Sequence, residues 1–406
     1  VVLGGRRRSA RISRSNLSDG RMADAKSGSW CENEGRRALA NNSVAYTDKP
    51  DMEGFMREWL SLVESKSGER GIFSRTAADN HVKMNGRRET GHEWGTNPCS
   101  EIILRPYQFC NLTEVVVRQG DDLENLRRKV RLATILGTAQ STFTNMPYLR
   151  KIWQKNTEEE RLLGVSLTGI MDNYLLSKTA DSKKWLEALK AQAIDVNRIY
   201  ADKLGVPASA AITCVKPSGT VSQLTDTASG IHARHSEYYI RTVRGDNKDP
   251  LTQFMKDSGI PAEPCVMKPD STTVFSFPTK SPTGAVTRND MTALEQLELW
   301  KNYALNWCEH KPSVTITVKD AEWMAVGAWV YENFDICSGI SFLPHSDHTY
   351  AQAPYQEIDE ETYNSLKEQM PESIDWSALS LYEKEDTTSG SQTLACTAGA
   401  CELVDI

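Results

Sequence analysis

The chain has 406 residues, of which 39% are hydrophobic and 25% are charged; this composition is typical of a globular protein and excludes a disordered one. No apolar run approaches the ~20 residues that a membrane span needs, and Arg6, Arg7 and Arg8 interrupt the apolar start where a signal peptide would continue. We therefore expect a cytoplasmic protein without a membrane partner, built as one large α/β domain or two ordinary ones.

The net charge of −7 is distributed unevenly. Residues 1–40 hold nine Lys or Arg against four Asp or Glu, whereas residues 357–406 hold two against twelve. The basic start could favour anionic ligands such as nucleotides or form a solvated face, and the acidic end is typical of a solvated helix or tail. Basic and aromatic residues do not alternate as in a nucleic-acid groove, so no nucleic-acid partner is expected.

The first residues of the chain have the pattern of a strand inside a domain. Residues 1–5 resemble a strand followed by a glycine turn, and because a protein seldom begins within a strand, we expect a fragment whose upstream part is missing. Residues 13–30 are polar and predict a loop, and residues 37–47 predict a strand or the start of a helix.

Further along, the spacing of apolar residues distinguishes helices from strands. It predicts, in chain order, a helix over 51–65, strands at 102–104 and 112–117, a helix over 123–136, a helix at 185–194, a strand over 210–215, a helix over 291–308 and a strand over 314–318. Thr157 and Glu160 form a capping-box sequence, which predicts a helix that begins there and continues through Leu162 and Leu163. Helices that alternate with strands indicate an α/β fold.

The nine cysteines are an odd number without a secretory context, so a disulfide framework is not expected. Most are expected to be buried, small apolar residues: Cys214, Cys265, Cys308 and Cys337. Four others have unusual surroundings: Cys99, Cys110, Cys396 and Cys401.

The sequence Thr-Asn-Pro-Cys-Ser-Glu at 96–101 places a cysteine between an amide and a carboxylate. In an extended segment, residues two apart project to the same side, so Asn97, Cys99 and Glu101 would converge on one ligand. The pattern alone also occurs by chance. It gains weight from Cys110, which precedes another asparagine, and from the cysteine pair at the end of the chain.

Cys396 and Cys401 follow a small, polar and aperiodic segment, residues 387–395, which predicts a flexible linker. A mobile cysteine pair fits a thiol–disulfide shuttle, because exchange needs access and motion. The alternative is a metal-binding module, but zinc needs four ligands and usually a tighter cysteine spacing. A linker of this length spans about 15–18 Å as a coil and ~30 Å when stretched, which is enough to reach a central pocket.

A Gly/Ser loop follows the strand expected at 210–215. If a helix begins there, its free N–H groups and its dipole would bind phosphate. The alternative is a simple Ser/Thr helix cap. The candidate phosphate-binding residues are Pro217, Ser218, Gly219, Thr220, Val221 and Ser222.

Taken together, these segments resemble the ribonucleotide reductases, and most closely the monomeric, adenosylcobalamin-dependent ribonucleoside-triphosphate reductases. The segments that carry the resemblance are TNPCSEI (96–102), Cys110, YLRKIWQKNTEEERLLGVSLTGI (148–170), KPSGTVSQL (216–224), SGIHARHSEYYIRTVR (229–244), KPSVTITV (311–318), HTYAQAPYQEI (348–358) and CTAGAC (396–401).

The resemblance implies a ten-stranded α/β barrel with a central finger loop, here without its N-terminal strands, as a catalytic domain over 1–386, and a flexible redox tail over 387–406. Cys99 would become a transient thiyl radical that takes the 3′ hydrogen of the ribose. Glu101 would act as the base on the 3′-hydroxyl, Asn97 would bind the sugar hydroxyls, and Cys110 would be one of two reducing cysteines.

The resemblance also implies partners. Adenosylcobalamin would be the cofactor, a ribonucleoside triphosphate the substrate, and residues 217–222 its phosphate site, with deoxynucleotides as possible effectors. Cys396 and Cys401 would re-reduce the active-site disulfide and be recharged by thioredoxin or a similar dithiol.

Some features depart from the family pattern. The second reducing cysteine belongs on an early barrel strand, and no residue here matches it. Arg70 and Ser74 stand where proline and asparagine are expected. The cobalt-ligating D-x-H-x-x-G sequence of cobalamin mutases is absent, but reductases of this type do without it. The alternative function is therefore a non-catalytic, nucleotide-binding half of a split reductase that needs a partner chain.

Overall fold

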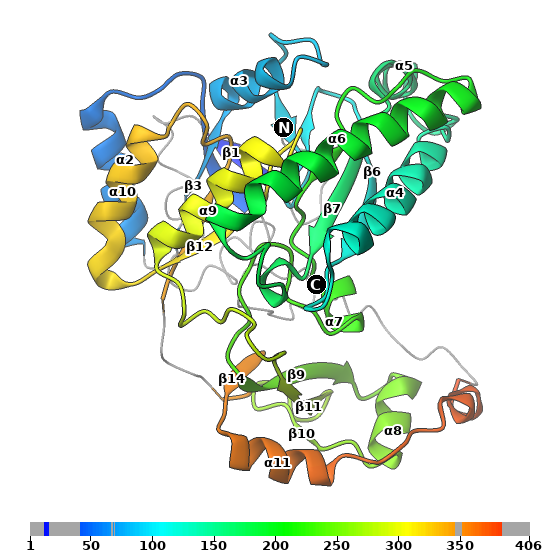
Figure 1. Cartoon of the computed structure of the whole chain (residues 1–406). Helices are drawn as coiled ribbons and strands as arrows, with labels where there is room; N and C mark the ends of the chain where they lie inside the picture. The colour runs from blue at the N-terminus through cyan, green and yellow to red at the C-terminus, as the bar shows by residue number, and fades with distance from the viewer. Residues whose placement is uncertain (1–11, 16–40, 66–67, 69, 346–350, 384–406) are drawn as a thin grey trace. The chain divides into compact units, whose positions relative to one another are not determined.

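The computed structural model describes residues 12–15, 41–65, 68, 70–345 and 351–383, which form two compact units (Figure 1). Unit 1 holds the described residues of 1–233, 284–286 and 290–345, and unit 2 holds those of 234–283, 287–289 and 346–406. None of the described helices combines the length and the apolar character that crossing a bilayer requires. The expected boundary between 386 and 387 lies outside the described residues and stays a prediction.

The strands of unit 1 form three small parallel sheets and a hairpin. The sheets are β1 (Ile12–Ser15), β2 (Asn41–Tyr46) and β3 (Gly71–Ser74); β12 (Thr315–Val318) and β13 (Ser341–Pro344); and β6 (Asn111–Val116), β7 (Leu163–Thr168) and β8 (Thr213–Cys214). The hairpin is β4 (Gly95–Thr96) with β5 (Ile103–Leu104).

Two isolated bridges join the three sheets into one row of strands. Ile72 pairs with Ile340 in antiparallel fashion, and Val215 pairs with Pro312 in parallel fashion. The resulting order is β1-β2-β3-β13-β12-β8-β7-β6, in which the first three strands run opposite to the other five. The expected mixed α/β fold is confirmed. The described strands do not close into a barrel, because β1 and β6 are the two ends of the row, so the ten-stranded barrel stays a prediction.

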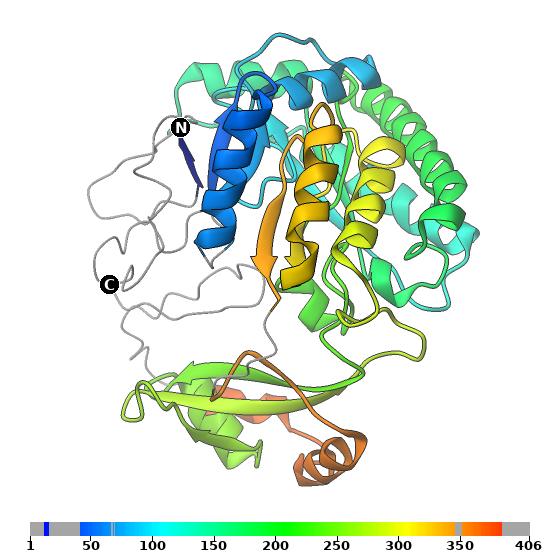
Figure 2. The same cartoon turned by 90° about the vertical axis from the view of Figure 1, so that its left-hand side faces the viewer.

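A row of helices packs against these strands in the matching order. It consists of α2 (Met52–Glu64), α10 (Trp323–Glu332), α9 (Ala293–Asn306), α6 (Thr179–Leu204) and α4 (Leu123–Gln140), and Figure 2 shows α2, α10, α9 and α6 side by side. The main core lies between the two rows and contains residues of both. Shorter elements complete the unit: α3 (Arg75–Asn85), α5 (Lys151–Glu160), α7 (Val221–Leu224) and the 3₁₀ turns Ile170–Asp172 and Asp320–Glu322.

Most of the expected helices and strands are confirmed, but two expectations are wrong. The segment Thr157–Glu160 ends α5 instead of beginning a helix, and Arg161 follows in a left-handed conformation with φ of 41°. Leu162 is buried and Leu163 begins β7, a strand that is buried along its whole length although its sequence, LGVSLT, alternates apolar with small residues. The loop expected at 13–30 overlaps β1, which reaches Ser15.

Unit 2 is built on an antiparallel sheet of four strands in the order β10-β11-β9-β14. These are β9 (Tyr238–Asp246), β10 (Ala262–Pro264), β11 (Thr272–Lys280) and β14 (Tyr355–Glu357), accompanied by α8 (Pro250–Asp257), α11 (Glu360–Gln369) and the 3₁₀ helix Trp376–Leu381. The ring of Phe254 packs against the rings of Trp376 and Tyr382. No residue of α11 is buried, which confirms the solvated helix expected in the acidic part of the chain.

Gly169 closes the turn after β7 and offers a test of this packing. Its φ is +82°, and a β-carbon there would lie 2.3 Å from the carbonyl oxygen of Val117. Gly259 has nearly the same φ, +81°, with open space around it. We expect Gly259→Ala to cost about 1–2 kcal/mol of unfolding free energy for the left-handed backbone, and Gly169→Ala roughly 1–3 kcal/mol more for the clash. Urea denaturation of both variants measures the difference, and equal losses would contradict the close packing at Gly169.

Candidate active site

The hairpin of β4 and β5 carries the sequence predicted as a site. At its tip, the Ser100 N–H donates to the Asn97 carbonyl over 3.0 Å, and Ser100 has a left-handed φ of 68°. The Ile102 N–H donates to the Asn97 side-chain oxygen over 3.1 Å. The tip is therefore a turn, and the expectation that residues 97–101 alternate as an extended strand is wrong.

Residues 310–313 hold the hairpin tip in place by hydrogen bonds to the backbone of residues 99–103. The fully buried His310 accepts from the Ile103 N–H at Nδ1 over 3.3 Å and faces the Leu163 carbonyl with Nε2 at 2.9 Å. Burial lowers the pKa of His310 well below its usual value, so the ring is neutral and Nε2 carries the hydrogen. Three further bonds reach consecutive carbonyls of the tip: Ser313 Oγ to Cys99 O at 2.5 Å, Lys311 Nζ to Ser100 O at 2.6 Å and Lys311 N to Glu101 O at 3.2 Å.

The side chains of Cys99 and Glu101 meet at Lys216. The Lys216 Nζ lies 3.5 Å from the Cys99 Sγ and 3.3 Å from the Glu101 Oε1. Glu101 is fully buried, whereas Cys99 is half-buried. Burial by itself would lower the pKa of Lys216, but the charges of Glu101 and Cys99 and the hydrogen bonds to them raise it above its usual value. The structure thus brings a thiol, a carboxylate and an ammonium group together.

The second carboxylate oxygen of Glu101, Oε2, is buried and has no hydrogen-bond partner among the described residues. A buried carboxylate oxygen in a folded protein normally accepts a hydrogen bond. Glu114 on β6 is a second carboxylate nearby, and burial raises its pKa, opposed by a hydrogen bond from Ser218 and the charge of Lys216. The site therefore offers Glu101 Oε2 as an acceptor for the hydroxyl of a ligand.

Cys110 precedes β6 and lies next to Gly164 of β7. A β-carbon at Gly164 would lie 3.4 Å from the Cys110 Sγ and 3.0 Å from the Ile102 side chain. Burial raises the pKa of Cys110, and the charge of Glu101 raises it further. Cys110 is therefore a neutral thiol within electrostatic range of Glu101.

Hydrogen bonds among serine residues stabilise the loop that is expected to bind phosphate. Ser218 and Ser222 are buried; the Ser222 N–H donates to the Ser218 hydroxyl over 3.0 Å, and the Ser218 N–H donates to the Ser229 hydroxyl over 2.9 Å. Thr220 is the N-cap residue before the short helix α7, and its side chain makes no capping hydrogen bond, so the simple-cap alternative does not apply to Thr220. Gly219 and Thr220 are exposed, while Pro217 and Val221 are half-buried.

Lys216 and Lys311 are site residues whose roles were not predicted. Both stand in the tripeptide Lys-Pro-Ser, at 216–218 and 311–313, and this repeat is the signal that could have found them. The parallel bridge between Val215 and Pro312 sets the two tripeptides side by side. Two indoles of the α9 region fix the backbones there: Trp300 Nε1 donates to Pro312 O at 3.0 Å, and Trp307 Nε1 donates to Cys214 O at 2.8 Å.

The expected redox pair, Cys396 and Cys401, lies outside the described residues, as does Cys31. The four cysteines expected to be buried are buried: Cys214, Cys265, Cys308 and Cys337. Within 41–65, 70–345 and 351–383, no cluster of three His, Cys, Asp or Glu side chains could hold a metal ion.

Known proteins resemble this chain in sequence over most of its length. No protein-family profile matches the chain. A probable adenosylcobalamin-dependent ribonucleoside-triphosphate reductase of Dictyostelium discoideum is 30% identical over 279 residues, which cover 67% of this chain and 36% of that protein. The adenosylcobalamin-dependent ribonucleoside-triphosphate reductase of Lactobacillus delbrueckii subsp. bulgaricus is 28% identical over 407 residues, which cover 90% and 53%. The chain thus spans about half the length, or less, of these curated relatives.

Solved structures of ribonucleotide reductases are also similar to this chain. A crystal structure of a B12-dependent, class II ribonucleotide reductase superposes with a TM-score of 0.76 at 25% identity, covering 93% of this chain and 56% of that one. The class Id reductase alpha subunit of Actinobacillus ureae shares the fold, with a TM-score of 0.56 at 13% identity over 82% of this chain and 70% of that one. The chain belongs to the ribonucleotide reductase family. Within that family it is homologous to the adenosylcobalamin-dependent ribonucleoside-triphosphate reductases, the class II enzymes.

Proposed function

We propose that this chain carries the active site at which a ribonucleoside triphosphate is reduced to its 2′-deoxy form by thiyl-radical chemistry. The single observation that carries the proposal is the buried, unpartnered Oε2 of Glu101, two residues from a half-buried thiol on the tip of a hairpin. A carboxylate in that state is ready to accept a hydrogen bond from a sugar hydroxyl, while the neighbouring sulfur faces the reacting carbon.

We assign the roles that the family resemblance implies. Cys99, as a thiyl radical, takes the 3′ hydrogen of the ribose, and Glu101 accepts the proton of the 3′-hydroxyl. The 2′-hydroxyl then leaves as water, and a hydrogen takes its place. Two thiols supply the electrons and become a disulfide; Cys110, a neutral thiol, is one of them, and the other is not assigned to this chain. The side-chain oxygen of Asn97 accepts from the Ile102 N–H within the turn, which leaves the side-chain amide hydrogens for the sugar.

Adenosylcobalamin would act next to Cys99, whose side chain is half-buried and therefore retains some accessible surface. When bound, the cofactor supplies a carbon-centred radical by homolysis of its cobalt–carbon bond. The chain's own part is to position the thiol, to keep Glu101 ready as an acceptor and to exclude water from Glu101, which is fully buried.

The remaining partners follow from the family. The loop 217–222 binds the substrate phosphates, chiefly through its exposed portion at Gly219 and Thr220, and deoxynucleotides are candidate effectors. The finger carrying Cys99 lies at the centre of a ten-stranded barrel, which requires further strands between β1 and β6.

The test is formation of deoxynucleotide from a ribonucleoside triphosphate, adenosylcobalamin and a small dithiol. Because the chain spans about half of its relatives, or less, the assay compares the chain alone with the chain joined to the part of those relatives that it does not cover. Turnover in either form supports the proposal. Tight nucleotide binding without turnover in either form would favour the alternative, a nucleotide-binding half that needs a separate partner chain.

The proposed redox tail has its own prediction. Cys396→Ala should leave turnover with a small dithiol unchanged and abolish turnover with thioredoxin, because only the large reductant needs a shuttle to reach the buried disulfide. Steady-state rates with the two reductants measure the effect, and Cys401→Ala should behave in the same way. Equal loss with both reductants would contradict a shuttle role.

A further inference from the structure

We propose that Lys216 is a positioning residue that holds the Cys99 thiol and the Glu101 carboxylate in their working arrangement. Its catalytic meaning rests on the proposed function, whereas the contact itself does not. The ammonium lies within hydrogen-bonding reach of both groups, at 3.5 Å from Sγ and 3.3 Å from Oε1, although Cys99 and Glu101 lie more than a hundred residues earlier in the chain.

The ammonium group of Lys216 fixes which partner donates in these hydrogen bonds. A protonated lysine donates hydrogens and accepts none, so a neutral Cys99 thiol can only accept from it, and the thiol's own hydrogen points away from Lys216. The same ammonium occupies Oε1 of Glu101 and leaves Oε2 as the acceptor for a ligand. Lys216 therefore selects which side of the thiol and which oxygen of the carboxylate face the substrate.

The backbone of Lys216 is fixed, so its side chain starts from a defined point. The Lys216 N–H donates to the Ser166 hydroxyl of β7 over 2.8 Å. On the other side, its carbonyl oxygen lies against Gly230, where an added β-carbon would approach that oxygen to 2.5 Å. Lys216 is also the last residue before the loop 217–222, so the same short segment reaches the thiol, the carboxylate and the proposed phosphate site.

Lys216 lies in an acidic and thiol-rich neighbourhood. It interacts electrostatically with Cys99 and Glu101 on the hairpin, Glu114 on β6 and Cys214 on β8. Cys110, before β6, interacts with Glu101 and with the positive charge of Arg88. Lys311, the other lysine at the tip, donates to the Ser100 carbonyl. A positive charge beside a thiol favours its thiolate form, which makes the reactivity of Cys99 a direct readout of the contact.

The experiment measures the alkylation rate of Cys99 by iodoacetamide, in the full chain without cofactor or substrate, from pH 6 to 10. Peptide mass spectrometry with fragment-ion localisation separates Cys99 from Cys110. The variants are Lys216→Met, Lys216→Arg and Glu101→Gln. The matched control is Lys129→Met, because Lys129 is a lysine of similar exposure, 34% against 30%, that pairs with the half-buried Asp121 away from this site.

We expect Lys216→Met to slow Cys99 alkylation at pH 7 roughly tenfold and to move the rate profile to higher pH, because a neighbouring opposite charge typically shifts a pKa by about 1–3 units and nucleophilicity recovers part of the loss. Lys216→Arg should stay within about threefold of the parent, since it keeps the charge. Glu101→Gln should speed alkylation, because a negative charge is removed while the positive one stays. Lys129→Met should change nothing.

An unchanged or faster rate in Lys216→Met, or the same slowing in Lys129→Met, would overturn the proposal. A merely structural role predicts faster alkylation, because loosening the tip exposes the thiol. Should Lys216→Met fail to fold, slower alkylation in Glu101→Gln would overturn the proposal just as well. The readout needs no turnover, so failure of the proposed reductase function and failure of this inference are separate results.

Discussion

Cys99→Ser is expected to reduce deoxynucleotide formation by at least about 1000-fold, which corresponds to about 4 kcal/mol of activation free energy. Serine keeps nearly the same shape, and its hydroxyl can still accept from Lys216, so the hairpin tip should remain in place. The O–H bond, however, is too strong to give up its hydrogen atom as a thiol does. The loss therefore isolates radical chemistry at sulfur from the positioning of the tip.

The assay for this prediction is single-turnover deoxynucleotide formation with adenosylcobalamin and a dithiol, together with circular dichroism to verify folding. Cys337→Ala is the matched control, because Cys337 is a fully buried thiol of unit 1 with no assigned role; it should retain activity. A folded Cys99→Ser protein with normal turnover would rule out Cys99 as the radical residue.

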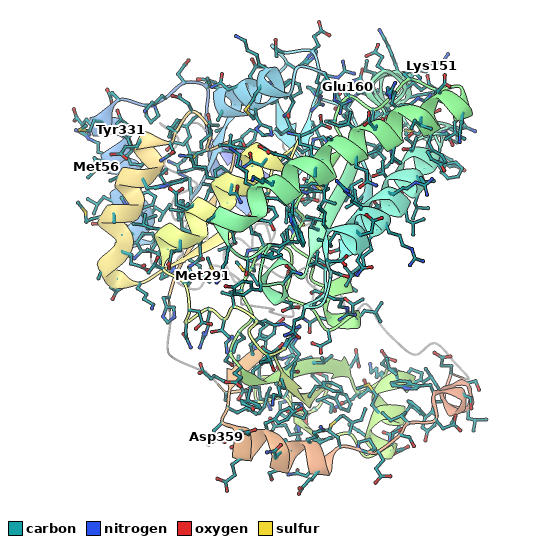
Figure 3. The ribbon with its side chains drawn as sticks, viewed as in Figure 1. Met56, Lys151, Glu160, Met291, Tyr331 and Asp359 are labelled. Atoms are coloured by element: carbon teal, nitrogen blue, oxygen red, sulfur yellow. The ribbon has the colours of Figure 1, made fainter. Side chains whose placement is uncertain are left out.

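Glu160→Gln is expected to destabilise unit 1 by about 3–5 kcal/mol, because it leaves the guanidinium of Arg88 buried without its counter-charge. Glu160 is the last residue of α5, and Figure 3 labels it together with Lys151 at the start of that helix. The Arg88 Nε and Nη2 lie 2.9 Å and 2.7 Å from the two carboxylate oxygens of Glu160. The Arg88 Nη1 also donates to the Ile103 carbonyl over 2.7 Å, so the pair supports β5 of the hairpin.

The pH dependence of this effect follows from the direction of the pKa shift. Burial alone would raise the pKa of Glu160, but the hydrogen bonds and charge of Arg88 outweigh it and lower the pKa. A carboxyl group whose pKa is lower in the folded state stabilises the fold fully above its unfolded pKa of about 4.3, and this stability is lost as pH falls. The gap between the parent and Glu160→Gln should therefore be full at pH 7 and shrink below about pH 4.

Urea denaturation at both pH values measures the gap. Glu53→Gln serves as the control, because Glu53 pairs with Arg57 on the exposed face of α2, and an exposed pair of this kind contributes little. A similar loss in both variants, or a gap that widens in acid, would contradict the assigned role of the Arg88–Glu160 pair.

Local patterns were enough to predict the helices of the outer row. In α2, the residues Phe55, Trp59 and Leu62 recur at helical spacing and are the ones that become buried. In α4, Leu126 and Val130 do the same. The periodicity is a property of a few adjacent turns, so it can be read without knowing the neighbours.

Local patterns failed at the boundary between α5 and β7. The strand β7 is buried from Leu163 to Thr168, and its sequence LGVSLT alternates apolar with small residues, but this short pattern does not show where the preceding helix ends. The charged run before it looked like the start of a helix, but Glu160 is the last residue of α5, and its carboxylate pairs with Arg88, 72 residues earlier in the chain. That pairing is invisible in any local window.

The candidate site likewise combines residues that the local sequence predicted with residues that it did not. The amide, thiol and carboxylate of Asn97, Cys99 and Glu101 stand within five residues of sequence, and their chemistry pointed to the site although the tip proved to be a turn. The two lysines that hold this tip come from other segments: Lys216 lies 117 residues from Cys99, and Lys311 lies 211 residues from Ser100.

The sequence by itself determined the mixed α/β class, the position of most helices and the chemical groups of the site, since these depend on residue type and on spacing within one or two turns. Only the tertiary structure decided the order of the strands, the end of α5 at Glu160 and the meeting of Cys99 and Glu101 at Lys216. The reason is physical: contacts between distant segments depend on how parallel strands line up, and the pattern within one strand does not identify its neighbours.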